Sequence, residues 1–273
     1  MRAWVTMCVQ HNAANAGIVR MCAASIASFL VASNTSEPLA VLADAGGARA
    51  LRQLNTSRAV RIVQLQAVAD DARRIEWPAW ATPDRVKRRS VTIPRHVLAL
   101  CKMQVWRLTE YEEVVYFDTD VLFLRNPQPL MTHSPAFAAI ALTHIDALVA
   151  CRGLRYLNAG VMKLRPSLAA YDTLRATLLH SNYTDCGGEP LTDQDVVRQL
   201  AFNSSVLGTF HPWPLCFNYR GWPNQRHCLK DEGPILYHNS MHGWPKVIRA
   251  ANGSRVPTAE LLAWATQGVA GIG

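Results

Sequence analysis

The sequence feature that most constrains the fold is an apolar run that ends in two aspartates. Residues 114–117, Val-Val-Tyr-Phe, have the composition of a buried strand, and Asp118 and Asp120 follow them directly. Burying bare carboxylates is costly, so both are expected at the carboxyl end of the strand, facing a cation or hydrogen-bond donors. A turn with two solvated acids is the simpler alternative, because short motifs recur by chance.

The spacing of the two aspartates indicates a metal site. Side chains at positions i and i+2 of an extended backbone face the same way, so Asp118 and Asp120 can hold one hard cation, Mg²⁺ or Mn²⁺. Such a cation is the usual partner of a diphosphate. The sequence therefore predicts a cation site at the end of this strand.

Strand-like and helix-like segments alternate through the first half of the chain. Strands are predicted at 3–9, 38–43, 59–65 and 113–118, and helices at 15–30 and 94–111, the second opened by Pro94. This alternation predicts an α/β fold with a mostly parallel central sheet and helices on both faces. Ligands of such sheets bind beyond the carboxyl ends of the strands, where the two aspartates are expected.

The second half is less regular. It suggests a strand at 155–167 that turns at Asn158–Gly160, helices at 167–181 and 192–202, a loop rich in proline and aromatic residues at 210–228, and a strand at 234–238. Thr192 is a plausible cap for the second helix. The sequence contains no repeat and no linker, so residues 1–273 are interpreted as one domain.

The charge and hydropathy of the chain limit the kinds of partner that it can have. A formal net charge of +8 suits an anionic ligand, yet the dense basic cluster is interpreted as a solvated loop and not as a nucleic-acid surface. That cluster contains Arg85, Lys87, Arg88, Arg89 and Arg95. No apolar run is long enough to span a bilayer.

The cysteines and the glycosylation sequons bear on the compartment. Cys8, Cys22 and Cys101 lie in apolar patterns and are expected in the core, whereas the loop residues Cys186, Cys216 and Cys228 could form a disulfide in an oxidising compartment. The absence of a CxxC spacing argues against zinc. Sequons begin at Asn34, Asn55, Asn182, Asn203 and Asn252, which exceeds the roughly one expected by chance. The first residues lack a signal-peptide pattern, so the compartment stays open between the cytoplasm and, if an anchor precedes this stretch, the Golgi lumen.

The order of several motifs resembles that of one enzyme family. The segments are 3–19, 99–130, 157–167, 191–197, 214–220 and 237–246, and they cover most of the chain to about residue 250. In this order they resemble glycosyltransferase family 8, the glycogenin-like and LgtC-like retaining transferases. The resemblance implies the GT-A fold, Mn²⁺ and a UDP-sugar donor, with a donor-binding half at about 1–125, an acceptor-side half at about 126–250 and a short C-terminal tail.

The resemblance implies a set of metal ligands. Asp118 and Asp120 match the family's metal-binding pair, with the backbone around Thr119 near the ribose, and His238 matches the third ligand. An imidazole ligand suits Mn²⁺ better than Mg²⁺, although Mg²⁺ stays possible. A hydrogen-bonded core histidine is the alternative for His238, and the nearby His242 is a second candidate ligand.

The same resemblance implies donor contacts. Lys246, with Gly243, matches a diphosphate-binding segment that arrives later than in the family, and Lys102 matches a helix lysine that contacts the donor. Arg95 is a further candidate for the phosphates. The remaining candidates are Met7, Val9 and Gln10 for uracil and ribose, although Val9 and Gln10 depart from the usual polar pair, and Asn158, Ala159 and Gly160 for the donor sugar. An ordinary turn is the alternative for the last three.

The residues beside the anomeric carbon are expected in the Asp-Gln-Asp segment. Asp193, Gln194 and Asp195 match it, and a helix cap with acids near the helix dipole is an equally good explanation that can hold at the same time. An amide is a poor nucleophile, so Gln194 is expected to support a retaining, front-face reaction.

The acceptor is expected to be an external sugar or glycoconjugate, because no tyrosine follows Tyr219 at the spacing that self-glucosylation needs. Trp213, Trp222 and Trp244 could stack on a sugar or cover the edge of the core. The function predicted is a retaining, Mn²⁺-dependent UDP-sugar transferase. The rivals are a haloacid-dehalogenase-like phosphatase and a non-catalytic carbohydrate-binding relative, and the oligomeric state is not determined by the sequence.

Overall fold

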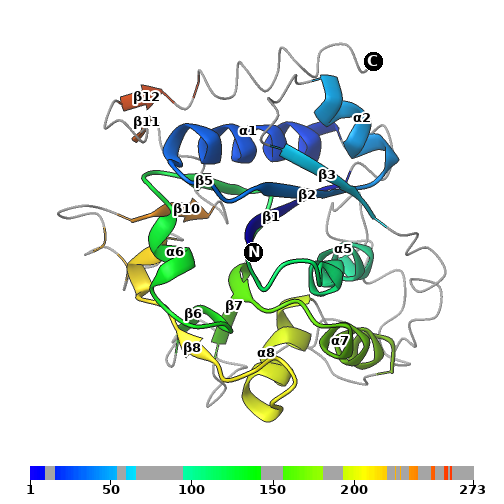
Figure 1. Ribbon diagram of the computed structural model, residues 1–273. Helices are drawn as coiled ribbons and strands as arrows, with labels where there is room; N and C mark the ends of the chain where they lie inside the picture. Colours follow the sequence, from blue (N-terminus) through cyan, green and yellow to red (C-terminus); the bar gives the residue numbers. More distant parts are fainter. Residues whose placement is uncertain are drawn as a thin grey trace, which may run out of the picture.

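A seven-stranded sheet runs through the middle of the molecule (Figure 1). The computed structural model describes residues 1–9, 16–53, 60–65, 95–142, 156–180, 193–219, 225, 228, 234–238, 247–249, 255–257 and 259. In spatial order the strands are β3 (Val60–Gln64), β2 (Leu39–Ala43), β1 (Arg2–Cys8), β4 (Glu113–Phe117), β7 (Tyr156–Leu164), β6 (Ala138–Leu142) and β8 (His211–Pro212). β7 runs antiparallel to both of its neighbours, and the other pairs are parallel. The predicted mostly parallel sheet is confirmed.

Helices cover both faces of this sheet, as the alternating pattern predicts (Figure 1). One core contains side chains of α1 (Ala16–Ala32), α2 (Ala45–Gln53) and α6 (Gln128–Thr132). The other contains side chains of α5 (Arg95–Met103), η2 (Gln104–Arg107), α7 (Leu168–His180) and α8 (Asp193–Asn203). Because side chains alternate along a strand, Val115 and Phe117 of β4 pack in the first core, and Val114 and Tyr116 pack in the second.

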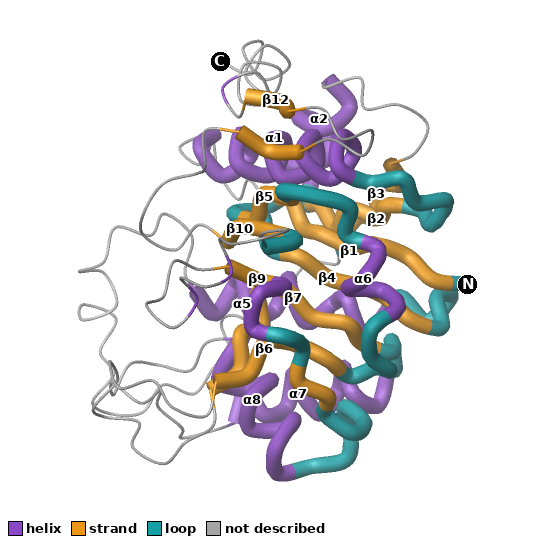
Figure 2. The backbone as a smooth tube through the Cα atoms, turned by 90° about the vertical axis from the view of Figure 1, so that its left-hand side faces the viewer, coloured by secondary structure: helices purple, strands orange, loops and turns teal. Residues whose placement is uncertain are grey.

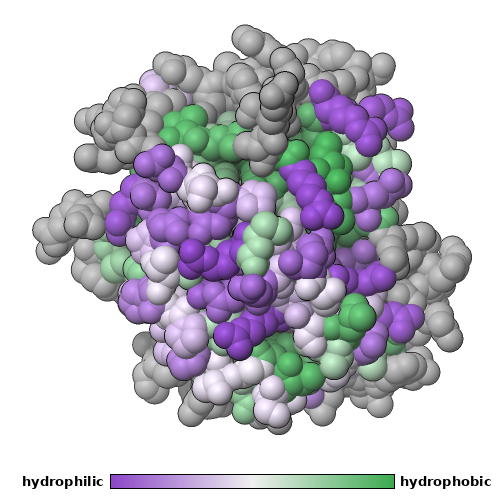
Figure 3. Space-filling view, viewed as in Figure 1, coloured by the Kyte–Doolittle hydropathy of each residue, from purple (hydrophilic) through white to green (hydrophobic). Residues whose placement is uncertain are grey.

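The helix α1 is covered on two sides. It has one charged residue, Arg20, and packs on the sheet through an aromatic cluster in which Phe29 stacks on Phe117 with ring centroids 5.6 Å apart. The hairpin of β11 (Val247–Arg249) and β12 (Arg255–Pro257) lies beside α1 in both views (Figures 1 and 2). Hydrophobic residues gather in the same upper region of Figure 3, while polar residues dominate the centre of that face. None of the described helices is long and apolar enough to cross a membrane.

A second, three-stranded sheet brings distant parts of the chain to the end of β4. It consists of β5 (Val121–Phe123), β10 (Leu236–His238) and β9 (Asn218–Tyr219), in the order β5-β10-β9. β10 pairs antiparallel with β5, so that His238 lies opposite Val121, one residue after Asp120. This register places the predicted strand at 234–238 next to the two aspartates.

Three expectations about local structure are wrong. The helix predicted to reach residue 111 ends at Met103 and continues as a 3-10 turn to Arg107. The strand predicted to turn at Asn158–Gly160 is continuous as β7, because pairing with β4 and β6 holds its two ends while the register shifts between Ala139 and Ile140 of β6. The segment 210–228, interpreted as a loop, contributes β8 to the edge of the large sheet and β9 to the small one.

The cysteines follow the expectation. Cys8, Cys22 and Cys101 are buried free thiols, and burial raises the pKa of Cys101 to about 12. Cys216 and Cys228 form a disulfide. Cys186 and the capping residue Thr192 lie outside the described residues.

A lysine that the sequence analysis did not single out joins three elements in the interior. Lys163 of β7 is 4% exposed. Its ammonium group donates to the carbonyl oxygens of Met131 at 2.8 Å and Ser134 at 2.7 Å, and it lies 3.0 Å from a carboxylate oxygen of Glu113. A buried ammonium is tolerated here because all three partners are oxygens.

Replacing this lysine should destabilise the protein. We expect Lys163→Met to lower the free energy of unfolding by about 3 kcal/mol, because it leaves buried carbonyl groups unsatisfied and removes the closest partner of Glu113. Arg165→Ala is the matched control, since Arg165 is 70% exposed and lies 3.7 Å from Glu113. The control should change stability by less than about 0.5 kcal/mol in urea unfolding. Equal effects of the two variants would contradict the role assigned to Lys163.

Candidate metal and donor site

The predicted aspartates lie where β4 ends, but in a turn and not on an extended backbone. Asp118 follows Phe117 directly, and the amide of Val121 donates to the carbonyl oxygen of Asp118 at 3.3 Å. The amide of Asp118 donates to the carbonyl oxygen of Gly160 at 2.7 Å, which fixes the start of the turn against β7. The alternation argument for Asp118 and Asp120 is therefore wrong in its geometry, although their carboxylates do converge.

The two carboxylates and one imidazole form a cluster. Ligand atoms of Asp118, Asp120 and His238 all lie within 4.8 Å of one another, and Nε2 of His238 is 3.3 Å from Oδ1 of Asp120. Bonds of roughly 2 to 2.5 Å to a shared ion separate two ligands by at most about 5 Å, so one divalent cation fits the three groups. A donor set of two oxygens and one nitrogen suits Mn²⁺ or another first-row ion.

A buried lysine lies behind this cluster. Lys102 of α5 is 5% exposed, and its Nζ is 2.9 Å from Oδ1 of Asp118, 2.5 Å from Oδ2 of Asp193 and 3.4 Å from the carbonyl oxygen of Ala159. Burial alone would lower the pKa of Lys102, but the carboxylates of Asp118 and Asp193 outweigh burial and raise it. The lysine is therefore a fixed cation that positions both acids.

The environment of Asp118 raises the pKa of its carboxyl group. Burial raises the pKa of Asp118, the ammonium of Lys102 opposes that rise, and the nearby carboxylates of Asp120 and Asp193 add to it. The hydroxyl of Tyr116 donates to Oδ1 of Asp118 at 2.6 Å, and burial raises the pKa of this tyrosine well above its usual value. Two carboxylates share one ammonium here and the carboxylate of Asp120 lies close to that of Asp118, which favours binding of a further cation.

A row of amide side chains lies beside the cluster. Oε1 of Gln194 accepts from Nδ2 of Asn158 at 3.2 Å and from the amide of Ala159 at 3.4 Å. Nδ2 of Asn218 donates to Oδ1 of Asn158 at 2.9 Å and lies 3.4 Å from Nδ1 of His238. The structure thus connects the predicted sugar-side residues to the predicted metal ligand.

The backbone at Gly160 leaves no room for a Cβ atom. A Cβ atom there would lie 2.1 Å from Cε1 of His238 and 2.8 Å from Oδ2 of Asp118. Glycine is therefore required by space and not by a turn, which corrects the interpretation of Asn158–Gly160 as an ordinary turn. The close approach of β7 holds the imidazole against the carboxylates.

The remaining predicted residues are partly described. Met7 and Val9 are buried at the end of β1, Arg95 is the first residue of α5, and Asp195 is buried with Arg198 at 3.3 Å. Trp213 is 3% exposed and belongs to the core, so covering the core is the better of its two interpretations. Gln10, His242, Gly243, Lys246, Trp222 and Trp244 lie outside the described residues.

Sequence reasoning missed two residues of the site. Tyr116 was assigned only to the strand, and Asn218 appeared only inside a motif. The sequence does contain a signal for Tyr116. It lies two residues before Asp118, and side chains two residues apart along a strand point to the same side. No local signal marks Asn218, since its partners are 60 and 20 residues away.

Comparison with known proteins agrees with the fold and the motifs. No protein-family model matches the chain. The chain is 27% identical to glycogenin-1 of Caenorhabditis elegans over 156 residues, which is 57% of this chain and 32% of that protein. It is 30% identical to UDP-glucuronate:xylan alpha-glucuronosyltransferase 2 of Arabidopsis thaliana over 89 residues, 32% of this chain and 13% of that protein. The matched regions therefore span a third or less of these relatives.

Two solved glycosyltransferase structures share the fold of this chain. A structure of galactosyltransferase LgtC in complex with donor and acceptor sugar analogs matches with a TM-score of 0.60 at 14% identity, covering 98% of this chain and 96% of that one. Mouse xyloside xylosyltransferase 1 matches with a TM-score of 0.56 at 15% identity, covering 90% and 100%. The chain therefore has the GT-A glycosyltransferase fold. In sequence it resembles glycosyltransferases of the glycogenin type, as the motif order predicts.

The close packing at Gly160 leads to a test of the cluster. We expect Gly160→Ala to weaken Mn²⁺ binding more than tenfold, because the added methyl group must displace the ring of His238 or the carboxylate of Asp118. Electron paramagnetic resonance titration of Mn²⁺ measures this directly, at a temperature where circular dichroism shows the variant folded. Unchanged affinity in the folded variant would show that the cluster does not bind the ion.

Proposed function

We propose that the protein is a retaining glycosyltransferase that moves a sugar from a UDP-sugar to an external sugar or glycoconjugate and depends on Mn²⁺. The observation that carries the proposal is the cluster of Asp118, Asp120 and His238 at the carboxyl end of β4, backed by Lys102. The same edge of an open α/β sheet is the usual position of a nucleotide ligand. The sequence likeness to glycosyltransferases supports the same class.

The donor set supports a divalent ion held by three side chains. Asp118 and Asp120 supply charged oxygens and His238 supplies a nitrogen, which is the mixture that favours Mn²⁺ over Mg²⁺. Asp118, Asp120 and His238 would hold the ion, and its charge would stabilise the negative charge that develops on UDP as it leaves. Lys246 stays a prediction from the sequence for the same diphosphate.

The surroundings of Gln194 support a reaction without an enzymatic base. Asp193 is held by Lys102 at 2.5 Å and Asp195 by Arg198 at 3.3 Å, so each neighbouring acid is engaged with a cation. The carboxamide of Gln194 is oriented by Asn158 and by the backbone of Ala159. A fixed amide dipole can stabilise positive charge at the anomeric carbon, but it is a poor nucleophile.

These features favour attack of the acceptor from the face that UDP leaves. In this route the bond from the anomeric carbon to the phosphate oxygen breaks while the acceptor hydroxyl bonds to the same carbon. The hydroxyl proton passes to the departing phosphate oxygen, so no carboxylate of the protein needs to accept it. The configuration of the donor is then kept in the product.

The donor and metal are tested together by thermal unfolding. UDP with Mn²⁺ at a hundredfold excess over Kd should raise Tm by about 5 °C or more, because it binds only the folded protein, and EDTA should abolish the shift. Asp120→Asn should remove the shift and lower turnover of a UDP-sugar at least about a hundredfold. Asp120 is replaced in this test and not Asp118, because Asp118 also forms an ion pair with the buried Lys102.

Asp172→Asn is the control for the loss of a carboxylate, because Asp172 is exposed on α7. It should keep both the shift and the turnover. Equal shifts with any phosphate compound, with or without metal, would favour the phosphatase alternative and contradict the proposal.

The stereochemical proposal is tested on the product. An α-linked UDP-sugar should give an α-linked product, and Gln194→Ala should lower kcat about a hundredfold while changing the Kd of UDP less than about threefold. NMR of the anomeric proton and calorimetric titration of UDP measure the two effects. Gln199→Ala, on the same helix α8, is the control and should change neither. A β-linked product, or lost UDP affinity with unchanged kcat, would refute the mechanism.

A further inference from the structure

Asn218 is a fully buried residue between the two halves of the site. Its exposed fraction is 0%, and it begins β9, the strand that pairs with β10. Its Nδ2 donates to Oδ1 of Asn158 at 2.9 Å and lies 3.4 Å from Nδ1 of His238. One carboxamide thus contacts a predicted metal ligand and a predicted sugar-side residue.

The geometry points to Asn218 as a positioning residue that fixes the ring of His238 and, through Asn158, the carboxamide of Gln194. This inference rests on the proposed function and adds a residue that the motif analysis gave no role. Asn158 donates in turn to Oε1 of Gln194 at 3.2 Å. The chain of contacts therefore runs from the metal side of the site to the sugar side through Asn218.

A carboxamide suits this position because it offers a donor and an acceptor on one rotatable group. With Nδ2 toward the ring, Nδ1 of His238 accepts and Nε2 carries the ring hydrogen, facing Asp120 at 3.3 Å. With Oδ1 toward the ring, Nδ1 donates and Nε2 presents its lone pair to a cation. Because one atom of Asn218 contacts both His238 and Asn158, the amide of Asn158 must turn as well in this arrangement. Oδ1 of Asn218 is buried without a hydrogen-bond partner among the described residues, so it can accept a hydrogen bond from Nδ1 of His238.

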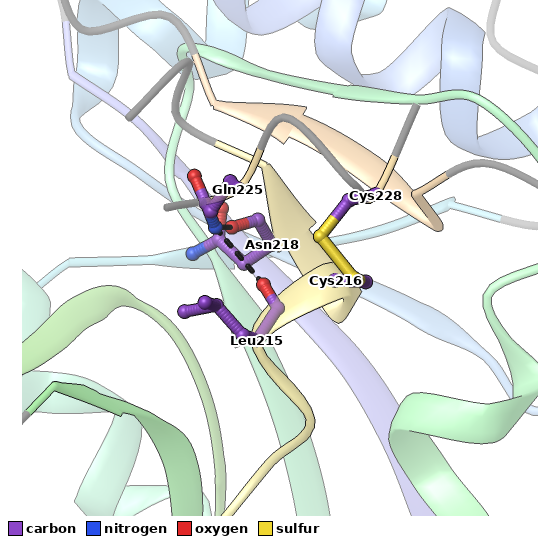
Figure 4. The surroundings of a disulfide bond; sticks show 5 residues. All are labelled: Leu215, Cys216, Asn218, Gln225 and Cys228. Atoms are coloured by element: carbon purple, nitrogen blue, oxygen red, sulfur yellow. Dashed lines mark hydrogen bonds between the residues drawn. A yellow bond between two sulfur atoms is a disulfide. The ribbon is translucent and has the colours of Figure 1, made fainter. Parts of the chain in front are cut away.

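The backbone of Asn218 is fixed by a second buried carboxamide, that of Gln225. Nε2 of Gln225 donates to the carbonyl oxygens of Asn218 at 2.7 Å and Leu215 at 2.9 Å (Figure 4). The disulfide of Cys216 and Cys228 joins the chain on either side of Asn218 and Gln225 (Figure 4). The two hydrogen bonds from Gln225, which is fully buried, and the disulfide anchor the segment that carries Asn218. This anchoring involves no ligand.

The experiment compares variants of Asn218 by their Mn²⁺ affinity in the presence of UDP. Asn218→Ala should weaken Mn²⁺ binding about tenfold and lower kcat, because both contacts are lost. Asn218→Asp should keep Mn²⁺ affinity within about threefold, since its carboxylate accepts from Nδ1 of His238 as the amide oxygen does when Nε2 binds the ion. Electron paramagnetic resonance titration gives the affinity without reference to activity.

Two further variants separate positioning from simple loss of stability. Ser28→Ala removes a buried hydroxyl that bonds Ser25 and Phe123, so it should lower Tm and leave Mn²⁺ affinity unchanged. Gln225→Ala should weaken Mn²⁺ binding a few-fold, and it serves as the test if Asn218→Ala does not fold.

The outcomes distinguish this inference from the proposed function. Wild-type protein that binds no Mn²⁺ with UDP would overturn the proposed function and the role of Asn218 with it. Wild-type binding with unchanged affinity in Asn218→Ala, or in Gln225→Ala where the first variant is unfolded, would overturn the positioning role alone. Equal weakening in Asn218→Ala and Asn218→Asp would overturn the part assigned to the acceptor oxygen.

Discussion

The site depends on one buried ammonium. Lys102 lies between Asp118 and Asp193 and also contacts the backbone of β7, so it joins α5, β4, α8 and β7 at a single atom. Two carboxylates could not be kept this close without it, because their repulsion and burial would favour protonation. A buried pair of this kind adds little net stability, but removing one partner typically costs about 3–5 kcal/mol. We therefore regard Lys102 as the residue that sets the geometry of the two acids.

The small sheet determines which residues reach the two aspartates at the end of β4. β5 follows Asp120 directly, and its antiparallel pairing with β10 aligns His238 with Val121. A shift of one residue in that pairing would turn the imidazole to the opposite face of the sheet. The parallel pairing of β9 with β10 then places Asn218 beside the same histidine. The cluster of Asp118, Asp120 and His238 is thus a consequence of sheet register, with Gly160 leaving the space that this register needs.

The chemistry of the site is divided between charged and neutral groups. The carboxylates gather where a cation fits, and amides lie on the side assigned to the sugar. The acids beside Gln194 are engaged with Lys102 and Arg198, which removes the simplest candidates for a base. A site of this kind acts by stabilising charge and fixing orientation, and both depend on rigid buried contacts.

The sequence by itself determined the class of fold and most of the strands, because apolar runs and helical periodicity report local burial. It also indicated that Asp118, Asp120 and His238 belong together, through the order of the motifs. Only the tertiary structure decided how they meet: the aspartates converge through a turn, and the strand at Gly160 is continuous because its neighbours hold both ends. The contacts of Asn218 could not be predicted either, since hydrogen bonds between residues far apart in the chain leave no local pattern.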